Sequence, residues 1–586
     1  MQSSPGWILM KSSVVDTSLV ARMPDGSAGA TFSWAAVGRE LGVSPEGPIN
    51  MAYLAVDRHA CSTIADKTAF RFHLADGAIR NLSYRQLAGL TDRFAHLLLT
   101  LGVHKGDCVF VLCGRICELY VAVLGALKVG AVVSPLFQAF GPEPIRLRIA
   151  QAAGKVLVTT ASVYQRKVAA IRPALPSLSH VLLVDDLGQG GVPGTLNLNA
   201  LLDTMPDTPV LAATSADDPA LLHFTSGTTG TPKGAVHVHA AVLTHYATAR
   251  MALDLRPDDV FWCTADPGWV TGTSYGIIAP LVTGVTSIVD EAEFDAVRWI
   301  ALLEAERINV WYTAPTAIRM LMKAGPALLA GHSFPDLRFV ASVGEPLNPE
   351  AVRWGKDALG QPIHDSWWQT ETGGIMIANS SAEVEKPGAM GRPVPGIVAH
   401  VVRQHAGAPL ELIEAPDTLG ELALETGWPS MFRAYLGQPE RYRQCFADNL
   451  YLSGDLVRRD ADGDFWFVGR RDDVIKSAGH LIGPCEVENV LMAHPAVAEA
   501  GVIGLPDALV GESIKAFVTL KSSFEPSAAL RTELLAHARR HLGAVVAPKE
   551  IAFAACLPHT RSGKIMRRLL RARELGLPEG DSSTLE

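Results

Sequence analysis

The ten residues from Thr225 to Gly234, Thr-Ser-Gly-Thr-Thr-Gly-Thr-Pro-Lys-Gly, constrain this chain most. They contain five hydroxyl side chains, three glycines and one lysine. Glycines let the backbone approach an oxyanion, hydroxyls donate hydrogen bonds to it, and the ammonium of Lys233 adds positive charge. The flanking segments 221–224 and 234–238 are apolar and typical of strands, so we expect a tight loop that cradles a polyphosphate. A Ser/Thr/Gly-rich surface linker is the alternative.

Alternating helical and apolar segments on both sides of this loop predict an α/β fold. Ser83 and Gln86 have capping-box spacing, and apolar residues then recur at helical spacing until Gly102. Helices that alternate with β-branched apolar runs indicate parallel sheets, so we expect two sheet-and-helix subdomains. Strands are predicted at 108–112, 156–159 and 181–184 in the first subdomain, and at 260–262, 286–289, 310–312 and 339–342 in the second.

The pattern changes in the last third of the chain. Residues 391–426 have short apolar runs separated by Gly and Pro, which predicts a small β-barrel or an antiparallel layer. The charged segment 469–473 is the best domain boundary, and about 115 residues follow it. The expected fold is a large N-terminal domain over 1–471, with the two subdomains and the small β-barrel, hinged to a small α+β C-terminal domain over 472–586.

Composition excludes several classes of function. The chain of 586 residues has 48% hydrophobic and 19% charged residues and a formal net charge of −9, with no basic run that would favour nucleic acid. No apolar stretch reaches the ~20 residues of a membrane span. The first 20 residues lack a secretory h-region, so a cytoplasmic location is expected. Eight cysteines without a Cys-x-x-Cys pair indicate free buried thiols.

The decapeptide resembles the phosphate-binding signature of the adenylate-forming superfamily, which includes acyl-CoA synthetases, luciferases and the adenylation domains of peptide synthetases. Its spacing differs from a Walker A loop, because Lys233 is followed by Gly234. The resemblance extends over residues 50–573, with the motifs in the family's order. It implies ATP contacts by Thr225, Ser226, Gly227, Thr228, Thr229 and Lys233.

A second motif is Asp-Ser-Trp-Trp-Gln-Thr-Glu-Thr-Gly at 365–373. Taken alone, it is more typical of two core tryptophans beside a turn than of a nucleotide site. Its similarity to the family's adenine and α-phosphate segment implies that Glu371 coordinates Mg²⁺, and Asp455 matches the aspartate that binds both ribose hydroxyls. The implied nucleotide-binding residues are Gly344, Glu345, Pro346, Asp365, Ser366, Trp367, Gln369, Thr370, Asp455 and Arg470.

The segment Pro-His-Thr-Arg-Ser-Gly-Lys at 558–564 precedes a basic helix. By composition it is a solvated basic tail, but it resembles the family segment whose lysine meets the attacking carboxylate and the α-phosphate. Lys564, Lys233 and the Mg²⁺ on Glu371 would then neutralise the repulsion between a carboxylate and ATP. The family afterwards rotates its small domain about a hinge, which Asp472 matches, and a thiol displaces AMP.

Further resemblances concern CoA and a second cation. Lys476, Ser477, Gly479 and His480 match the face that the family presents in its thiol step, while Leu481 stands where many relatives have arginine. For Lys476 an ordinary surface lysine is the alternative. Arg166 and Lys167 match basic residues that bind the CoA nucleotide, with an exposed basic pair as the alternative, and His494 matches a cation site.

The segments 262–272 and 342–350 closely resemble those of acetyl-CoA synthetases. The implied acyl pocket consists of Trp269, Val270, Thr271, Val343 and Trp368. Relatives for longer acids commonly have Gly where Trp368 stands, and an indole would fill the tunnel behind it. One more methylene gains ~0.8 kcal/mol on burial, whereas overpacking costs ~1–3 kcal/mol, so acetate should be preferred and propionate tolerated.

The resemblance therefore implies ATP-dependent ligation of acetate to CoA, with release of pyrophosphate and AMP. A ligase for propionate or butyrate and a nucleotide-binding pseudoenzyme are the alternatives. No carrier domain follows residue 573, which argues against a peptide-synthetase module. Relatives are commonly switched off by acetylation of the matching lysine, so enzymes that acetylate and deacetylate Lys564 are expected partners.

Overall fold

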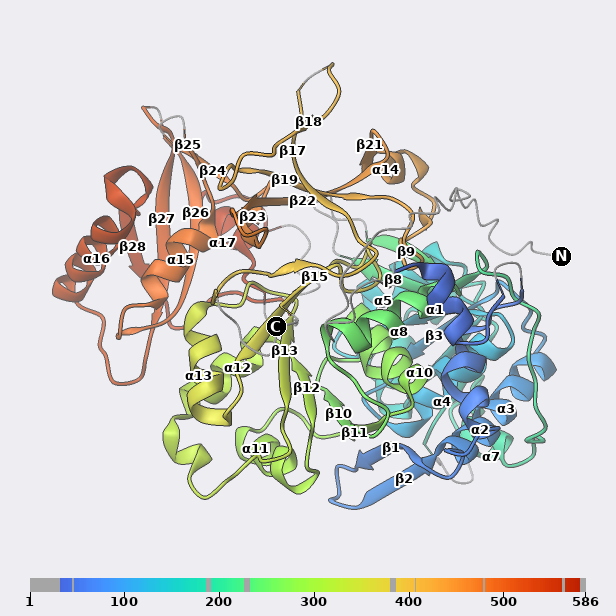
Figure 1. The fold of residues 1–586 in the computed structure, drawn as a ribbon. Helices are drawn as coiled ribbons and strands as arrows, with labels where there is room; N and C mark the ends of the chain where they lie inside the picture. Colours follow the sequence, from blue (N-terminus) through green and yellow to red (C-terminus); the bar gives the residue numbers. More distant parts are fainter. Residues whose placement is uncertain are drawn as a thin grey trace.

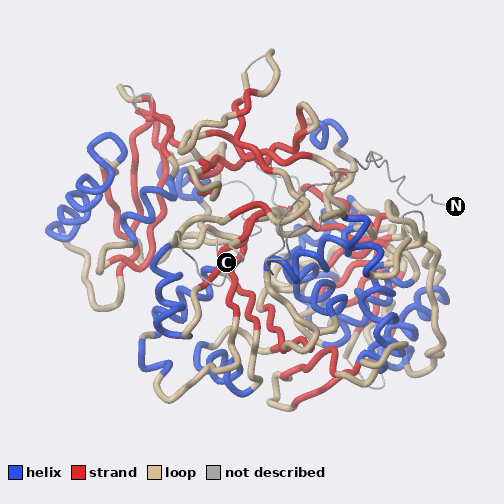
Figure 2. The backbone as a smooth tube through the Cα atoms, in the orientation of Figure 1, coloured by secondary structure: helices blue, strands red, loops and turns tan. Residues whose placement is uncertain are grey.

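The computed structural model describes residues 32–44, 47–185, 191–225, 232–379, 386–405, 407–477, 480–507, 509–560 and 564–579. Four sheets organise these residues, and helices cover the faces of the two largest (Figures 1 and 2). The last sheet and its helices, orange to red in Figure 1, form a separate lobe beside the rest.

The first large sheet has eight strands in the order β20-β9-β8-β4-β3-β5-β6-β7. Its centre is parallel, as the apolar β-branched runs predicted, and β8 and β9 form an antiparallel hairpin. Its strands are β3 (Cys108–Leu112), β4 (Val132–Pro135), β5 (Val156–Thr159), β6 (His180–Leu183), β7 (Leu196–Asn197), β8 (Pro219–Thr225), β9 (Lys233–Val238) and β20 (Ala434–Tyr435).

One prediction about the helices around this sheet, the capping box at Ser83, is confirmed. Ser83 accepts a hydrogen bond from the backbone of Gln86, whose side chain returns to Ser83, and the helix ends before Gly102. The helical segments are α1 (Trp34–Glu40), η1 (Tyr53–Asp57), α2 (Arg58–Ala60), α3 (Tyr84–Thr100), α4 (Cys117–Lys128), α5 (Pro142–Gln151), α6 (Ala161–Val163), η2 (Tyr164–Val168), η3 (Arg172–Ala174), α7 (Leu198–Leu202) and α8 (Ala241–Ala252).

The second large sheet has nine strands in the order β16-β15-β14-β13-β12-β10-β11-β1-β2. Strands β14 to β11 are parallel, and their carboxyl ends carry the segments 264–272, 344–350 and 368–373. Its strands are β1 (Thr68–His73), β2 (Ile79–Ser83), β10 (Val260–Cys263), β11 (Thr286–Asp290), β12 (Val310–Thr313), β13 (Phe339–Val343), β14 (Ile363–Trp367), β15 (Ile377–Ala378) and β16 (Arg392–Pro393).

Helices connect the parallel strands of this sheet, as in other doubly wound arrangements. The longest are α11 (Ala296–Ala305), α12 (Pro315–Ala324) and α13 (Pro349–Leu359), and shorter turns follow β10 and α12. These shorter segments are α9 (Val270–Thr273), η4 (Ser274–Ile278), α10 (Ala279–Thr283) and η5 (Pro326–Leu329). The prediction of two sheet-and-helix subdomains is confirmed.

The third sheet corrects the expected small barrel. It is wholly antiparallel, in the order β18-β17-β19-β22-β21 with β23 also on β22, and among the described residues no pairing closes it. Its elements are β17 (Ala399–Arg403), β18 (Glu411–Leu412), β19 (Gly420–Glu425), β21 (Phe446–Ala447), β22 (Leu450–Arg459), β23 (Phe465–Arg470) and the helix α14 (Pro439–Arg443). Short strands and Gly/Pro turns suit an open layer as well as a barrel, and the edge strand β18 is too short to close the sheet.

The fourth sheet belongs to the C-terminal lobe, which is α+β as expected. Val502, Ile514 and Leu534 are fully buried in its own apolar core. The chain leaves the third sheet after Arg470 and enters the fourth at Ile475. The elements are β24 (Ile475–Ser477), β25 (His480–Ile482), α15 (Pro484–Met492), β26 (Val497–Asp507), β27 (Gly511–Leu520), α16 (Ala528–Val546), β28 (Glu550–Phe553) and α17 (Arg567–Glu574).

Two further expectations concern the whole chain. All eight cysteines are free, and six of them are buried or half-buried, while Cys61 and Cys556 are exposed. Among the described helices, none is long and apolar enough to cross a membrane.

Candidate active site

The phosphate-loop motif lies in the hairpin between β8 and β9. Thr225, the last residue of β8, is directly opposite Lys233, the first residue of β9, so the motif is the tight connection that its apolar flanks predicted. Ser226, Gly227, Thr228 and Thr229 lie outside the described residues.

Lys233 and Glu371 meet at Tyr435, a residue that no sequence motif indicated. Strand β20 pairs with β9 and places Tyr435 beside Ala235. The Tyr435 hydroxyl donates to Glu371 Oε1 at 2.6 Å, and Lys233 Nζ lies 5.5 Å from the Tyr435 ring centroid. Burial lowers the pKa of Lys233, Arg441 lowers it further, and Glu371 raises it. A cation and a carboxylate thus flank the ring of Tyr435.

Asp455 is the centre of a second cluster. Its carboxylate is almost fully buried and accepts from Trp367 Nε1 (2.9 Å), Gln369 Nε2 (3.0 Å) and Arg470 Nη1 (2.7 Å). Tyr451 donates to Gln369 Oε1 at 2.7 Å, which orients the amide. A carboxylate accepts about four hydrogen bonds, so these three donors fix Asp455 and leave it capacity for a ligand hydroxyl.

The segment 344–346 follows β13. Gly344 has φ +98°, a left-handed conformation that glycine adopts without strain. The neighbouring Glu345 carboxylate accepts from Thr316 Oγ1 at 2.6 Å and from Arg319 Nη2 at 2.5 Å. Helix α12 therefore already pairs the Glu345 side chain, and Arg319 is a second residue that sequence reasoning missed.

Asp365 and Ser366 lie at the end of β14. Burial raises the pKa of Asp365 to about 7, against hydrogen bonds from the Ser366 and Leu347 backbones that lower it. The Ser366 backbone donates to Asp365 Oδ1 at 2.9 Å. Thr370 and Glu371 follow in a turn whose Gly373 has φ +68° and no space for a side chain, because an added Cβ would lie 2.3 Å from the Ser430 carbonyl oxygen. The 365–373 motif is thus a buried strand end followed by a tight turn.

The residues predicted to bind the acid follow or end three strands of the second large sheet, β10, β13 and β14. Trp269 and Val270 are half-buried at the start of α9, and Thr271 is buried. Val343 ends β13, and Trp368 directly follows β14 and is 8% exposed. Since β12, β13 and β14 are adjacent, the structure brings Val343 and Trp368 to one edge of the sheet.

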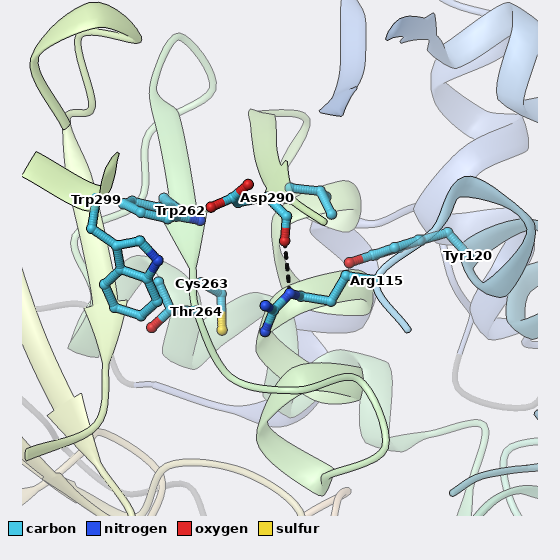
Figure 3. A pocket seen from close by; sticks show the side chains of 8 residues that line it. Arg115, Tyr120, Trp262, Cys263, Thr264, Asp290 and Trp299 are labelled. Carbon is cyan, nitrogen blue, oxygen red and sulfur yellow. Dashed lines mark hydrogen bonds between the residues drawn. The ribbon is translucent and has the colours of Figure 1, made fainter. Parts of the chain in front are cut away.

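A small cavity lies at the end of β10 (Figure 3). Cys263 and Trp299 line it with Arg115, whose Nε donates to the Asp290 carbonyl oxygen at 2.7 Å. Its volume of about 10 Å³ suffices for one water molecule at most. Its role is structural, because Arg115 follows β3 and so ties the first sheet to β11 of the second.

Lys564 faces the two clusters from the C-terminal lobe. Its segment is fastened by a bridge between His559 and Ile565 and by a 2.6 Å contact between His559 Nε2 and Glu499 Oε1. Lys564 is exposed, and partial desolvation of its amine by the surrounding protein lowers its pKa.

Charges of the large sheets act on Lys564 directly. Arg470 lowers its pKa further, whereas Asp455, Glu345 and Glu371 raise it. These four residues come from the second and third sheets and the turn after β14. The charges of Asp455 and Glu371 therefore act on Lys564, although the three residues belong to different parts of the sequence.

The residues expected to contact CoA lie in two separate places. Arg166 and Lys167 lie in η2, where Lys167 Nζ donates to the Gln138 carbonyl oxygen at 2.7 Å. Lys476 and His480 are exposed in β24 and β25, and Ser477 is buried between them. Strands β24 and β25 and helix α5, against which η2 packs, are on opposite sides of Figure 1. Gly479 and the side chain of Leu481 lie outside the described residues.

Two sites were predicted to hold cations. His494 Nδ1 accepts from the Ala496 backbone at 3.3 Å, and its Nε2 lies 3.2 Å from Glu533 Oε1. Within the described ranges, no three His, Cys, Asp or Glu side chains are grouped to hold a metal. Glu371 is compatible with Mg²⁺, because Mg²⁺ keeps several waters and takes one or two carboxylates, and Tyr435 occupies only Oε1.

Comparisons with known proteins show which family the chain resembles. Residues 57–436 match the AMP-binding enzyme family, and residues 486–564 match the AMP-binding enzyme C-terminal domain. The chain is 43% identical over 557 residues to the acetyl-coenzyme A synthetase of Bacillus subtilis, covering 95% of this chain and 96% of the relative. It is 41% identical over 567 residues to the acetyl-coenzyme A synthetase of Methanothrix thermoacetophila, covering 92% of this chain and 85% of the relative.

Solved structures show the same likeness. An acyl-CoA synthetase from Brucella canis superposes with a TM-score of 0.74 at 34% identity, covering 95% of this chain and 99% of the other. An anthranilate CoA ligase in complex with anthranoyl-AMP superposes with a TM-score of 0.81 at 28% identity, covering 90% of this chain and 97% of the other.

Proposed function

The chain belongs to the AMP-binding enzyme family, and we propose that it is an AMP-forming ligase that joins acetate to CoA through an acetyl-adenylate. One observation carries the proposal: the charges of Asp455 and Glu371 act on Lys564 in a chain 43% identical over 95% of its length to an acetyl-coenzyme A synthetase. ATP and CoA are the co-substrates.

In the first half-reaction a carboxylate oxygen of acetate attacks the α-phosphorus of ATP. The new bond is O–P, the bond to the β-phosphate oxygen breaks, and pyrophosphate carries away the electron pair. Both reactants are anions, so positive charge must offset their repulsion and hold them in line. Lys564 supplies that charge at the α-phosphate and Lys233 at the phosphate loop. Mg²⁺, when bound at Glu371, would neutralise further phosphate charge.

Asp455 positions the nucleotide. Its carboxylate is fixed by Trp367, Gln369 and Arg470, and its remaining acceptor capacity suits a ribose hydroxyl. Arg470 offers a second contact to the ribose or to a phosphate. The adenine would lie against residues 344–346, with Thr370 at the α-phosphate.

In the second half-reaction the CoA thiol attacks the acetyl carbonyl carbon, and AMP leaves with the electron pair of the broken C–O bond. Lys564 serves only the first step, so the small lobe has to withdraw it. We place the domain boundary and the hinge at Asp472, in the connection between β23 and β24. Rotation there would bring Lys476, Ser477, Gly479 and His480 to the cleft, with Arg166 and Lys167 as candidate contacts for the CoA nucleotide.

Three smaller proposals accompany this function. Trp269, Val270, Thr271, Val343 and Trp368 form a pocket sized for acetate that tolerates propionate. Acetylation of Lys564 would abolish its charge and stop the first half-reaction. A cytoplasmic location and a cation at His494 remain predictions.

The test is carboxylate-dependent exchange of labelled pyrophosphate into ATP, measured with acetate, propionate, butyrate and hexanoate. Strongest exchange with acetate is expected. Strongest exchange with butyrate or hexanoate would keep the chemistry and overturn the pocket. No exchange with any acid, together with measurable ATP binding, would overturn the proposal in favour of a pseudoenzyme.

A further inference from the structure

Trp368 is held by a buried hydrogen-bond chain that spans three strands. Its Nε1 donates to Tyr312 Oη at 3.1 Å, and Tyr312 Oη lies 2.9 Å from Ser366 Oγ. Ser366 Oγ donates to the Ser342 carbonyl oxygen at 2.7 Å. Tyr312 belongs to β12, Ser342 to β13 and Ser366 to β14, so the chain ties the indole to the sheet behind it.

The proton positions in this chain follow from its ends. An indole N–H only donates and a backbone carbonyl only accepts, so Tyr312 accepts from Trp368 and donates to Ser366. Every member is then satisfied, which buried polar groups require. Tyr312 is fully buried, and burial raises the pKa of its hydroxyl, so the proton stays on the tyrosine.

A second tyrosine packs against the same indole without bonding to it. The Tyr275 ring lies 5.2 Å from the Trp368 ring at an interplanar angle of 68°. Its hydroxyl is engaged elsewhere, with Thr248 Oγ1 at 2.7 Å and the Ile375 backbone at 2.7 Å. The two tyrosines therefore contact Trp368 differently, Tyr275 by packing and Tyr312 by a directed hydrogen bond.

We propose that Tyr312 is a positioning residue that sets the acid chain length by holding the Trp368 indole in the orientation that closes the acyl pocket. This inference rests on the proposed function, since it assumes that Trp368 faces the acid. An indole that packs against Tyr275 alone can tilt away from a longer acid, whereas one also tied to β12 cannot. Selectivity between acetate and propionate thus depends on a residue that does not itself contact the acid.

The test compares Tyr312→Phe, which removes only the hydroxyl, with Tyr275→Phe as matched control. Both variants lose one buried tyrosine hydroxyl, but only the first releases Trp368. For each we would measure kcat and KM for acetate, propionate and butyrate by pyrophosphate exchange, together with Tm. Tyr312→Phe should raise the propionate-to-acetate ratio of kcat/KM about three- to tenfold, the range that one hydrogen bond supports. Tyr275→Phe should lower Tm comparably and leave the ratio unchanged.

The variant Trp368→Phe is an independent test of the hydrogen bond, because phenylalanine keeps an aromatic ring but lacks the N–H that donates to Tyr312. Tyr312→Phe combined with Trp368→Phe should give no larger shift than Trp368→Phe alone if the hydrogen bond is the means. Additive shifts, an unchanged ratio in Tyr312→Phe, or an equal shift in Tyr275→Phe would each overturn the inference. If Tyr312→Phe does not fold, an unchanged ratio in Trp368→Phe overturns it instead. Absence of exchange in the wild type with every acid would instead overturn the proposed function.

Discussion

The surroundings of Trp368 and those of Lys564 are built in opposite ways. Trp368 is 8% exposed, packs on Tyr275 and is hydrogen-bonded into three strands of one sheet. Lys564 belongs to a separate lobe, is exposed, and interacts with Asp455 and Glu371 through charge. Selection of a small acid needs a wall that does not move, because interiors resist changes of even one methylene. The proposed role of Lys564 in one half-reaction requires that its charge can be withdrawn afterwards. An electrostatic attraction that acts over a distance allows this, because no packed contact has to be broken.

The largest expected effect comes from removing the charge of Lys564. Lys564→Ala should lower acetate-dependent pyrophosphate exchange about 10²- to 10³-fold, the usual loss when one stabilising group is removed from a transition state. Formation of acetyl-CoA from supplied acetyl-AMP should remain near the wild-type rate. Lys549→Ala is the control, because Lys549 lies in the same lobe and its amine bonds the Ala544 carbonyl oxygen of that lobe. Equal loss of both half-reactions would contradict the assigned role.

The second effect removes the fixed wall. Trp368→Gly should shift the preference from acetate toward butyrate and longer acids, by about ten- to a hundredfold in the ratio of kcat/KM, since one methylene in a pocket is worth that much. The measurement is pyrophosphate exchange across the acid series. Trp262→Phe, in the separate apolar core of the same sheet, tests whether any tryptophan change has this effect. A chain-length preference that stays unchanged in Trp368→Gly would remove this residue from the pocket.

The third prediction uses pH to separate the two regions. Desolvation and Arg470 lower the pKa of Lys564 below the ordinary 10.5, so its ammonium is lost at a lower pH than that of an exposed lysine. Exchange should therefore fall on the alkaline side as this group deprotonates, while thioester formation from acetyl-AMP should not show the same fall. Lys564→Arg, which keeps its charge to higher pH, should move the alkaline limb upward. If the rates of both half-reactions fell at the same alkaline pH, Lys564 would not be the group whose deprotonation causes the fall.

The smallest expected effect concerns the pH dependence of stability at Asp365, which lies in β14 close to Trp368. Burial raises the pKa of Asp365 to about 7 from its ordinary 3.8, so the folded state binds this proton more tightly than the unfolded state. Its contribution to stability is fully present below about 3.8 and is lost as pH rises to about 7. Replacement by the neutral Asp365→Asn should therefore raise Tm relative to the wild type more at about pH 8 than at about pH 5. The exposed Asp76→Asn should show no such trend, and a trend of opposite sign for Asp365→Asn would contradict burial as the cause of the shift.

Local signals predicted the elements of this fold well. The capping box at Ser83 and the strand at 108–112 are present with the expected bounds, because both depend on hydrogen bonds and burial between neighbouring residues. The barrel was wrong because closure depends on whether distant edge strands meet, which short Gly/Pro-separated strands do not specify. The residues Tyr435, Arg319 and Tyr312 were missed because none belongs to a local motif.

The sequence by itself predicted the chemistry of this protein, because its motifs resemble those that bind phosphate and nucleotide in the adenylate-forming superfamily. Only the tertiary structure decided which of these groups interact: Lys564 with the charges of Asp455 and Glu371, and Trp368 with Tyr312 within the sheet. These interactions depend on the pairing of strands far apart in the chain and on the orientation of the C-terminal lobe. Both are fixed by burial and charge summed over the whole molecule, which no single segment encodes.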